Sequence, residues 1–436
     1  MRIIQYEVEK LYNSFNHQIT FNENITIILG QNGLGKTAML AMLYGLFSHD
    51  FHLLLKYPYD SIILTFDNKK RLIIKKDKNQ DEQDIDFTYG HQSIKLSKIL
   101  QNAESAKRYI RKYLSVDVLR HIDEDLWQIR QTGEVLSSIE VMSRYSSLYP
   151  QLLEFNIYGC PQWLEEIISS IKIDFIGTKR LQTQVPNEER TYARRLEIHD
   201  TIDEDAQDFI RLLSSTKSKA AAIAAEIDKT YPNRLIEQFK EENEKTILKK
   251  SQLVKNLNKL NTLRNELIEV GLMDVTEDEV LDNTFVLTKE ISTVFNVYVE
   301  DSNKKLSAYS DMSKRVKLFI DLINKHFLYK KITISSTEGF TLKSTITDEK
   351  ILLKQLSSGE QHMFILYYHL LFKYAPNTLI LLDEPEISLH ISWQKDFIAD
   401  LLQIMELNPM TLLIATHAPS IVRSHWSLTS ELEAGI

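Results

Sequence analysis

A glycine-rich loop between a buried strand and a helix constrains this chain most strongly. Residues 25–29 have the composition of a buried strand, and apolar side chains recur at helical spacing after the loop. A Gly-x4-Gly-Lys-Thr loop that follows a strand and precedes a helix is typical of a phosphate-binding loop. The backbone N–H groups of such a loop surround phosphate oxygens. The chain is therefore expected to contain an α/β domain that binds a nucleoside triphosphate through Gly30, Gln31, Asn32, Gly33, Leu34, Gly35, Lys36 and Thr37.

Two side chains of this loop have distinct expected roles. We expect Lys36 to contact the β- and γ-phosphates and the Thr37 hydroxyl to bind Mg²⁺. A chance glycine turn before a helix is the alternative, but the predicted strand and helix on either side disfavour it.

A second predicted strand ends in two carboxylates. Residues 379–382 are aliphatic throughout, which is typical of a parallel strand that is buried on both faces. Ligands bind beyond the carboxyl ends of such strands, so we expect Asp383 to hold Mg²⁺ and Glu384 to activate the attacking water. A strand end that carries Asp-Glu by chance is the alternative, and the phosphate-binding loop counts against it.

A serine- and glycine-containing segment opens another predicted helix. Hydroxyl and free N–H groups at a helix start form a second anion site, although an ordinary helix N-cap is the alternative. Because one domain needs only one γ-phosphate site, we expect this segment to contact the nucleotide of a second copy. Its residues are Ser357, Ser358, Gly359 and Glu360.

A histidine follows the last predicted strand of this set. His417 comes directly after the strand at residues 411–415 and shortly after the Asp-Glu strand. A lone histidine is more often structural, but in this constellation we expect His417 to contact the γ-phosphate as a catalytic residue.

The region between these motifs predicts a mostly helical insertion. Apolar series on both sides of Pro232 predict an antiparallel helix pair that turns at residues 231–233, and residues 2–10 predict an edge strand. The expected parts are the first half of the α/β head (1–92), a helical subdomain (93–170), a strand and linker (171–200), a helical insertion with a short coiled coil (201–328) and the second half of the head (329–436).

Composition limits the classes of partner and compartment. The 436 residues carry a net charge of −8, so a nucleic-acid contact would need a local basic patch. The single cysteine, Cys160, excludes an intramolecular disulfide and fits a reducing cytoplasm. No run approaches the ~20 apolar residues of a membrane helix, so no membrane contact is expected.

Two basic sets are candidates for a DNA contact. Both are interrupted by glutamates (188, 189, 242 and 244), and a solvated helix face explains the second set at least as well. The first set is Lys179, Arg180, Arg190, Arg194 and Arg195, and the second is Lys245, Lys249, Lys250, Lys255 and Lys259.

Taken together, the motifs resemble those of ABC-type ATPase heads, and specifically the branch of SMC, RecF and OLD-like proteins. The match covers about half of the chain, whose long insertion disfavours a transporter subunit. Residues 386–390 resemble the Pro-Glu-x-x-Leu-His run of the OLD-like branch, with Ser388 to His390 at the D-loop position. Residues 176–181 resemble the strand end that carries the Q-loop, for which Arg180, Gln182 and Gln184 are candidates. Ser358 stands where the usual signature has its first glycine.

This resemblance implies a site that two subunits share. Lys36, Thr37, Asp383 and Glu384 would act within one subunit, whereas Ser357 and Gly359 would act on the partner's nucleotide. His417 would be the switch histidine. The implied cofactors are ATP and Mg²⁺, and the implied assembly is a homo-oligomer, at least a dimer, whose heads pair through the ATP sites.

The resemblance also suggests a biological role. OLD-like enzymes continue into a TOPRIM nuclease domain, but no acidic cluster follows His417 here, so a nuclease would be a separate polypeptide. Such stand-alone ATPases occur in bacterial anti-phage systems, with a TOPRIM-like effector in the PARIS type and an HNH nuclease in the Septu type. The expected function is to hold this effector and to release it when a phage-encoded trigger arrives. The alternative is a RecF- or SMC-like ATPase that clamps DNA as a dimer.

The phosphate-binding loop yields a first prediction. Lys36→Ala should abolish detectable ATP binding, because the phosphates lose their main charged partner. Titration with a fluorescent ATP analogue measures this directly. An affinity equal to that of the wild-type protein would contradict the assignment of the loop.

Overall fold

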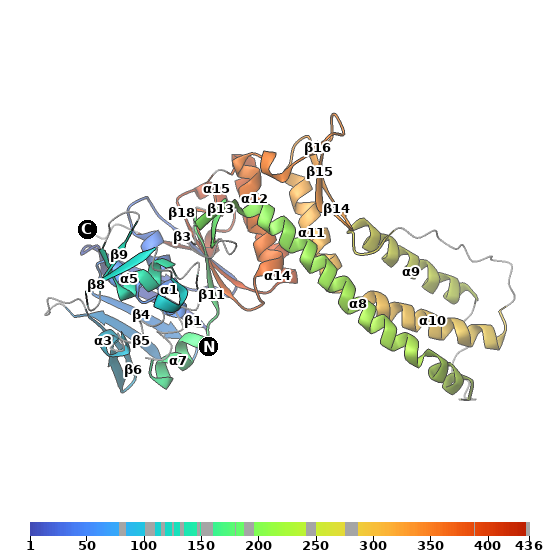
Figure 1. The fold of residues 1–436 in the computed structure, drawn as a ribbon, viewed down its shortest axis with the longest axis horizontal. Helices are drawn as coiled ribbons and strands as arrows, with labels where there is room; N and C mark the ends of the chain where they lie inside the picture. Colours follow the sequence, from blue (N-terminus) through green and yellow to red (C-terminus); the bar gives the residue numbers. More distant parts are fainter. Residues whose placement is uncertain are drawn as a thin grey trace. The chain divides into compact units, whose positions relative to one another are not determined.

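The chain forms two compact units, one of which is inserted into the other. The first unit consists of Met1–Asp200 and Tyr374–Ile436, and the second is Thr201–Lys373 (Figure 1). The expected α/β fold from both chain ends, with a mostly helical insertion, is confirmed. The insertion, however, extends to Lys373 rather than to residue 328. The computed structural model describes residues 1–77, 84–100, 110–114, 118–123, 126–130, 135–145, 149, 160–178, 180–186, 196–240, 250–274, 287–387 and 389–432.

A parallel five-stranded sheet in the first unit positions the site. Its interior strands are aliphatic and almost completely buried, as expected for a sheet that is covered on both faces. Parallel strands bring their carboxyl ends to one edge, so the segments after the interior strands meet there. The order is β11 (Ile173–Ile176), β17 (Leu379–Asp383), β18 (Thr411–Thr416), β3 (Ile25–Leu29) and β19 (Thr429–Glu431).

Helices of the first unit connect or flank these strands. α1 (Lys36–Phe47) begins directly at the glycine-rich loop, and most of its residues are buried. Further helices of this unit are α2 (His52–Lys56), α7 (Gln162–Ser169), α13 (Ile391–Gln394), α14 (Phe397–Leu407), α15 (Pro419–Val422) and the short η4 (Trp426–Leu428).

A six-stranded antiparallel sheet packs in the same core. The fully buried Tyr6 of β1 donates its hydroxyl to the carbonyl of Met39 in α1 at 3.0 Å. The predicted edge position of β1 is wrong, because β1 pairs with β2 on one side and with β4 on the other. The polar residues of β1 face away from the core and do not mark an unpaired edge. The order is β2 (Phe15–Thr20), β1 (Ile3–Leu11), β4 (Ser61–Phe66), β5 (Arg71–Lys76), β6 (Ile85–Tyr89) and β7 (Gln92–Lys95).

The expectation of a helical subdomain at 93–170 is wrong in part, because this region also contains a three-stranded antiparallel sheet. This sheet has a small hydrophobic core separate from the main one, and Trp127 belongs to it. Trp127 donates its indole N–H to the Ser138 hydroxyl at 2.8 Å. Strands this short carry too few alternations for the sequence pattern to show them. The elements are α3 (Leu96–Leu100), β8 (Leu119–Asp123), β9 (Leu126–Ile129), β10 (Val135–Ser137) and α5 (Ser138–Tyr145), and the pair β12 (Gln182–Pro186) and β13 (Leu196–Asp200) follows later.

The second unit contains three long helices, α8 (Thr201–Lys240), α9 (Lys250–Glu269) and α10 (Lys289–Ser307) (Figure 1). The predicted turn at residues 231–233 is wrong, because α8 continues through Pro232 and α10 packs against both α8 and α9. Proline removes one helix hydrogen bond. Arg234 reinforces this turn, since its guanidinium donates to the Ile227 carbonyl at 2.8 Å and pairs with Asp301 of α10.

The rest of the second unit packs on an aromatic core. Phe209 of α8 stacks on Phe340 with ring centroids 4.0 Å apart. None of the helices that the structure describes has the length and apolar composition needed to cross a membrane. The remaining elements are α11 (Ser310–His326), β14 (Lys330–Ser335), β15 (Gly339–Ser344), β16 (Lys350–Ile351), η2 (Leu353–Gln355), α12 (Ser358–Tyr368) and the π-helical η3 (His369–Lys373).

Gly45 in α1 yields a test of this packing. A Cβ atom there would lie 2.7 Å from both the Asp50 carbonyl oxygen and the Leu53 Cβ. Alanine would favour the helix by about 1 kcal/mol, but overpacking against backbone costs about 1–3 kcal/mol. Gly45→Ala should therefore lower the midpoint of urea unfolding, and an unchanged or higher midpoint would contradict this packing.

Candidate active site

The glycine-rich loop is held in place by tight local packing. Gly35 has a left-handed backbone with φ of 87°, and a Cβ atom there would lie 2.4 Å from Leu11 Cδ2. Both observations require glycine at this position. The buried Leu34 carbonyl accepts a hydrogen bond from His17 Nε2 at 2.8 Å. His17, which the sequence did not single out, therefore anchors the loop from β2.

Lys36 is the first residue of α1, directly after the loop glycines. Its Nζ donates to the carbonyl oxygens of Gly30 at 2.7 Å and Gln31 at 2.9 Å. Burial lowers the pKa of Lys36, whereas the nearby carboxylates of Glu384, Glu386 and Asp383 oppose this shift. The ammonium group thus lies between backbone carbonyls and three carboxylates, and it is placed to bind a phosphate that enters the loop.

Thr37 and Asp383 meet although they are 346 positions apart in the chain. The Thr37 hydroxyl lies 3.0 Å from each carboxylate oxygen of Asp383. Burial raises the pKa of Asp383, the Thr37 hydrogen bond opposes this shift, and the neighbouring Glu384 adds to it. A hydroxyl and a carboxylate are oxygen donors of the kind that Mg²⁺ prefers, and a divalent cation would offset the cost of burying this carboxylate. These two residues therefore fit a Mg²⁺ site.

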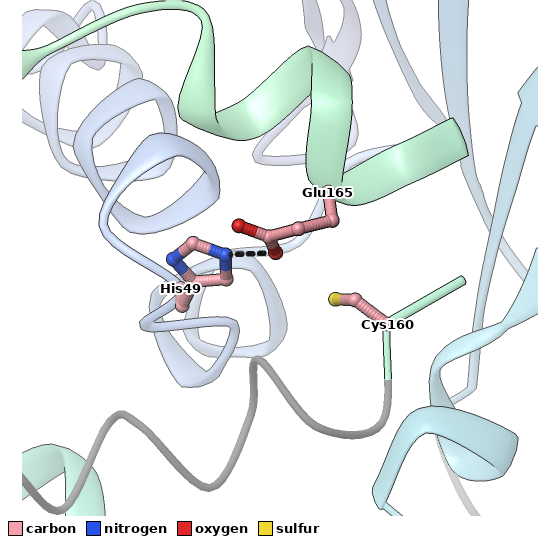
Figure 2. Close-up of side chains that lie close together, drawn as sticks. All are labelled: His49, Cys160 and Glu165. Carbon is pink, nitrogen blue, oxygen red and sulfur yellow. Dashed lines mark hydrogen bonds and ion pairs between the residues drawn. The ribbon is translucent and has the colours of Figure 1, made fainter. Parts of the chain in front are cut away.

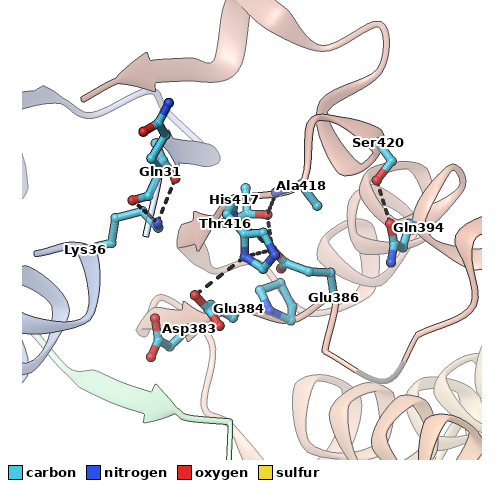
Figure 3. A network of polar contacts seen from close by, with 12 residues as sticks. Gln31, Lys36, Asp383, Glu384, Glu386, Gln394, Thr416, His417, Ala418 and Ser420 are labelled. Carbon is cyan, nitrogen blue, oxygen red and sulfur yellow. Dashed lines mark hydrogen bonds and ion pairs between the residues drawn. The ribbon is translucent and has the colours of Figure 1, made fainter. Parts of the chain in front are cut away.

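Glu384 follows β17 in a strained conformation. Its φ is 44°, a left-handed value that costs a non-glycine residue on the order of 1 kcal/mol, and its N–H donates to the Ala415 carbonyl at 2.9 Å. The Glu384 carboxylate reaches His417, whose Nδ1 lies 3.6 Å away (Figure 3). The structure thus brings together Lys36, Asp383, Glu384 and His417 at the carboxyl edge of the parallel sheet, while their individual roles stay predictions.

Glu386 organises the histidine and was not predicted as a site residue. Its Oε1 accepts from the Thr416 hydroxyl at 2.5 Å and from the His417 N–H at 3.0 Å, and it lies 3.2 Å from His417 Nδ1 (Figure 3). Glu386 is buried, so these donors satisfy one oxygen of a desolvated carboxylate. In the sequence, Glu386 stood out only as part of the family resemblance of residues 386–390. Local patterns could not show its role, because its partners are about 30 positions away.

Arg180 packs behind this carboxylate. Its buried guanidinium donates to the Pro385 carbonyl at 3.0 Å. Burial lowers the pKa of Arg180 to about 10, and the charge of Glu386 opposes the shift. Gln182 and Gln184, the other Q-loop candidates, belong to β12. The structure thus couples Arg180 to the Asp-Glu-Pro-Glu segment, while the Q-loop role stays a prediction.

Ser357 to Glu360 belong to the second unit, where they form a capping box at the start of α12. The Glu360 carboxylate accepts from the Ser357 N–H at 2.8 Å and from Lys330 Nζ at 2.7 Å. Burial would raise the pKa of Glu360, but the donors Lys330 and Ser357 lower it overall. The N-cap interpretation is confirmed, and the Glu360 side chain is engaged within its own unit. The contact of Ser357, Ser358 and Gly359 with a partner's nucleotide stays a prediction.

Several predicted residues lie outside the described part of the chain. Among the described lysines of the second basic set, Lys250, Lys255 and Lys259 are exposed on α9. The residues outside it are Ser388 of the D-loop position, Lys179, Arg190, Arg194, Arg195, Lys245 and Lys249 of the basic sets, and the intervening Glu188, Glu189, Glu242 and Glu244.

Comparison with known proteins yields one family. A model of an AAA ATPase domain matches residues 1–422. No curated protein matches the chain.

Among solved structures, the chain is similar to an Smc head domain with an extended coiled coil from Pyrococcus furiosus, bound to the C-terminal domain of ScpA. The identity is 13%, over 97% of this chain and 91% of that one, with a TM-score of 0.35. An SMC head domain from Thermotoga maritima is 10% identical over 97% of this chain and 92% of that one, with a TM-score of 0.32.

The position of Glu386 yields a prediction for this site. Glu386→Ala should slow ATP turnover on the order of a hundredfold, because a misplaced His417 loses its alignment, whereas ATP affinity should change little. Steady-state turnover and a nucleotide-binding titration separate the two effects. Gln394→Ala is the matched control, since it removes contacts with Ser420 at 2.5 Å and with the Leu389 carbonyl at 3.1 Å. Equal turnover in both variants would contradict the role of Glu386.

Proposed function

The chain belongs to the AAA ATPase domain family, and we propose that it hydrolyses MgATP at a site that a second copy completes. The observation that carries this proposal is the meeting of Thr37 and Asp383 at one sheet edge, with Lys36, Glu384 and His417 beside them. A chance loop or a chance Asp-Glu pair would not bring these five side chains together.

Each residue then has one chemical task. The loop N–H groups and Lys36 bind the phosphates, and Thr37 with Asp383 would hold Mg²⁺, which when bound neutralises phosphate charge. Glu384 accepts the proton of the attacking water. His417 contacts the γ-phosphate, and Glu386 holds the histidine in place through the contacts of 3.0 and 3.2 Å. The strained backbone of Glu384 supports this assignment, because such strain is commonly retained where a side chain must be aimed.

The second part of the site would come from a partner subunit. The capping box places the first N–H groups of α12 at a defined helix start, where an anion is favoured. Ser357 and Gly359 would meet the γ-phosphate of the nucleotide bound by the partner. ATP would therefore bring two heads together, and hydrolysis would release them.

For the biological role, we propose a sensor and scaffold in bacterial anti-phage defence. The protein would hold a separate TOPRIM-like or HNH nuclease effector and release it when a phage-encoded trigger arrives. The support is the resemblance of residues 386–390 to the OLD-like branch. The alternative, an ATP-dependent clamp on DNA, is favoured by the exposed Lys250, Lys255 and Lys259 on α9.

A salt titration separates these two roles. Fluorescence anisotropy with labelled duplex DNA and ATP should show no binding at moderate salt if the protein is an effector scaffold. A clamp would instead bind, with an affinity that falls steeply as the salt concentration rises, because phosphate contacts release counterions. Such binding, lost in a Lys255→Ala/Lys259→Ala variant, would contradict the scaffold and support the clamp.

Water activation by Glu384 yields a further prediction. Glu384→Gln should bind ATP as the wild type does. Its rate of hydrolysis should fall by at least about a hundredfold, because the amide cannot accept the proton. The trapped nucleotide should hold the heads together, which light scattering with ATP detects as an increased mass. Glu431→Gln, at the end of β19 in the same sheet, is the matched control. Undiminished turnover by Glu384→Gln would refute its role.

A further inference from the structure

Three side chains with metal-binding atoms meet beside the phosphate-loop helix. His49 lies just beyond the end of α1, Cys160 precedes α7, and Glu165 lies in the first turn of α7. One ligand atom from each residue lies within 4.8 Å of the other two, and His49 Nε2 is 2.7 Å from Glu165 Oε2. Figure 2 shows the Cys160 thiol directed toward the His49–Glu165 pair. Across the described residues, no other group of three such side chains is this close.

We propose that His49, Cys160 and Glu165 bind a thiophilic divalent metal ion, with Zn²⁺ as the best fit. Nitrogen, sulfur and carboxylate oxygen form a donor set that Zn²⁺ accepts in tetrahedral geometry, with the fourth position left to water. The thiol argues against Mg²⁺ or Ca²⁺, which take oxygen ligands. This site is separate from the Mg²⁺ site of Thr37 and Asp383, which offers only oxygen.

A divalent cation would be balanced in charge by these three groups once the thiol is deprotonated. Burial raises the pKa of the Cys160 thiol to about 12, and the Glu165 carboxylate adds to this shift. A bound Zn²⁺ would displace the thiol proton to solvent and form a Zn–S bond. Its two positive charges would then be balanced by one thiolate and one carboxylate, so the partly buried site would carry no net charge. Only a small rearrangement is needed, since ligand atoms around tetrahedral zinc lie roughly 3.3–3.8 Å apart.

The position of this site suggests what the metal does. α1 begins at Lys36 of the phosphate-binding loop, and α7 leads into β11 of the parallel sheet. A metal bound by both segments would fasten the far end of α1 to the sheet. Binding of the metal would therefore tie these two segments of the first unit together. In the alternative interpretation, the hydrogen-bonded His49–Glu165 pair lies beside a half-buried thiol and binds no metal.

Cobalt spectroscopy tests the proposal directly. The tag-free chain, freed of metal with a chelator, is titrated with CoCl₂ and then with ZnCl₂. Cobalt bound to a thiolate absorbs in the near ultraviolet, and because Cys160 is the single cysteine, any such band reports on that residue. We expect a saturable band that is absent in Cys160→Ser and is erased by Zn²⁺. The absence of a band in the wild type, or its persistence in Cys160→Ser, would overturn the site.

Substitution of the other two ligands completes the test. His49→Ala and Glu165→Gln should each weaken metal binding at least about tenfold in competition with a chromogenic chelator. Glu166→Gln is the matched control, because its carboxylate instead accepts from Gln162 Nε2 at 2.9 Å. Equal weakening by Glu166→Gln would overturn the assignment. If a variant folds poorly, protection of the wild-type thiol from Ellman's reagent by Zn²⁺ gives the same answer, and an unprotected thiol would contradict the proposal.

Discussion

The parallel register of β3, β18 and β17 brings the parts of the site together. In this register Leu29 pairs with Thr416, and Ala415 pairs with Asp383, so three strand ends lie side by side. The glycine-rich loop, the Asp-Glu pair and the histidine follow these ends directly. Because the site is formed at the ends of these short strands, the segments that connect the strands in sequence can be long. A unit of residues 201–373 is inserted there without disturbing the contact between Thr37 and Asp383.

This arrangement concentrates negative charge. Asp383, Glu384 and Glu386 lie close enough to influence one another and Lys36, and the buried Arg180 lies behind them. Carboxylates so close together repel one another, which is costly unless cations compensate. Lys36 and Arg180 supply part of that compensation, and a divalent cation at Thr37 and Asp383 would supply more. The clustered carboxylates thus destabilise the folded protein by their mutual repulsion, and the same carboxylates are the groups that a MgATP site needs.

Sequence predicted those features that are encoded locally. The glycine spacing, the aliphatic strand before Asp383 and the serine at the start of α12 each carry their signal within a few residues. It could not predict Glu386 as the partner of His417 or His17 as the anchor of Leu34, since both contacts depend on the sheet order. The turn predicted at Pro232 was also wrong because of a long-range contact. Arg234 and Asp301 reinforce a helical turn at a proline, where local sequence rules would end the helix. The short strands at 119–137 escaped because their pattern is too brief.

The most direct measurement of the shared site is a mixing experiment with two inactive variants. Lys36→Ala removes the phosphate contact, and Ser357→Asp keeps an N-cap but places a negative charge where the partner's phosphate would lie. Each alone should hydrolyse ATP very slowly. In an equal mixture, half of the pairs are mixed and each contains one intact composite site, so about a quarter of the wild-type rate should return. A mixture no more active than the two variants measured separately would show that each chain forms its site alone.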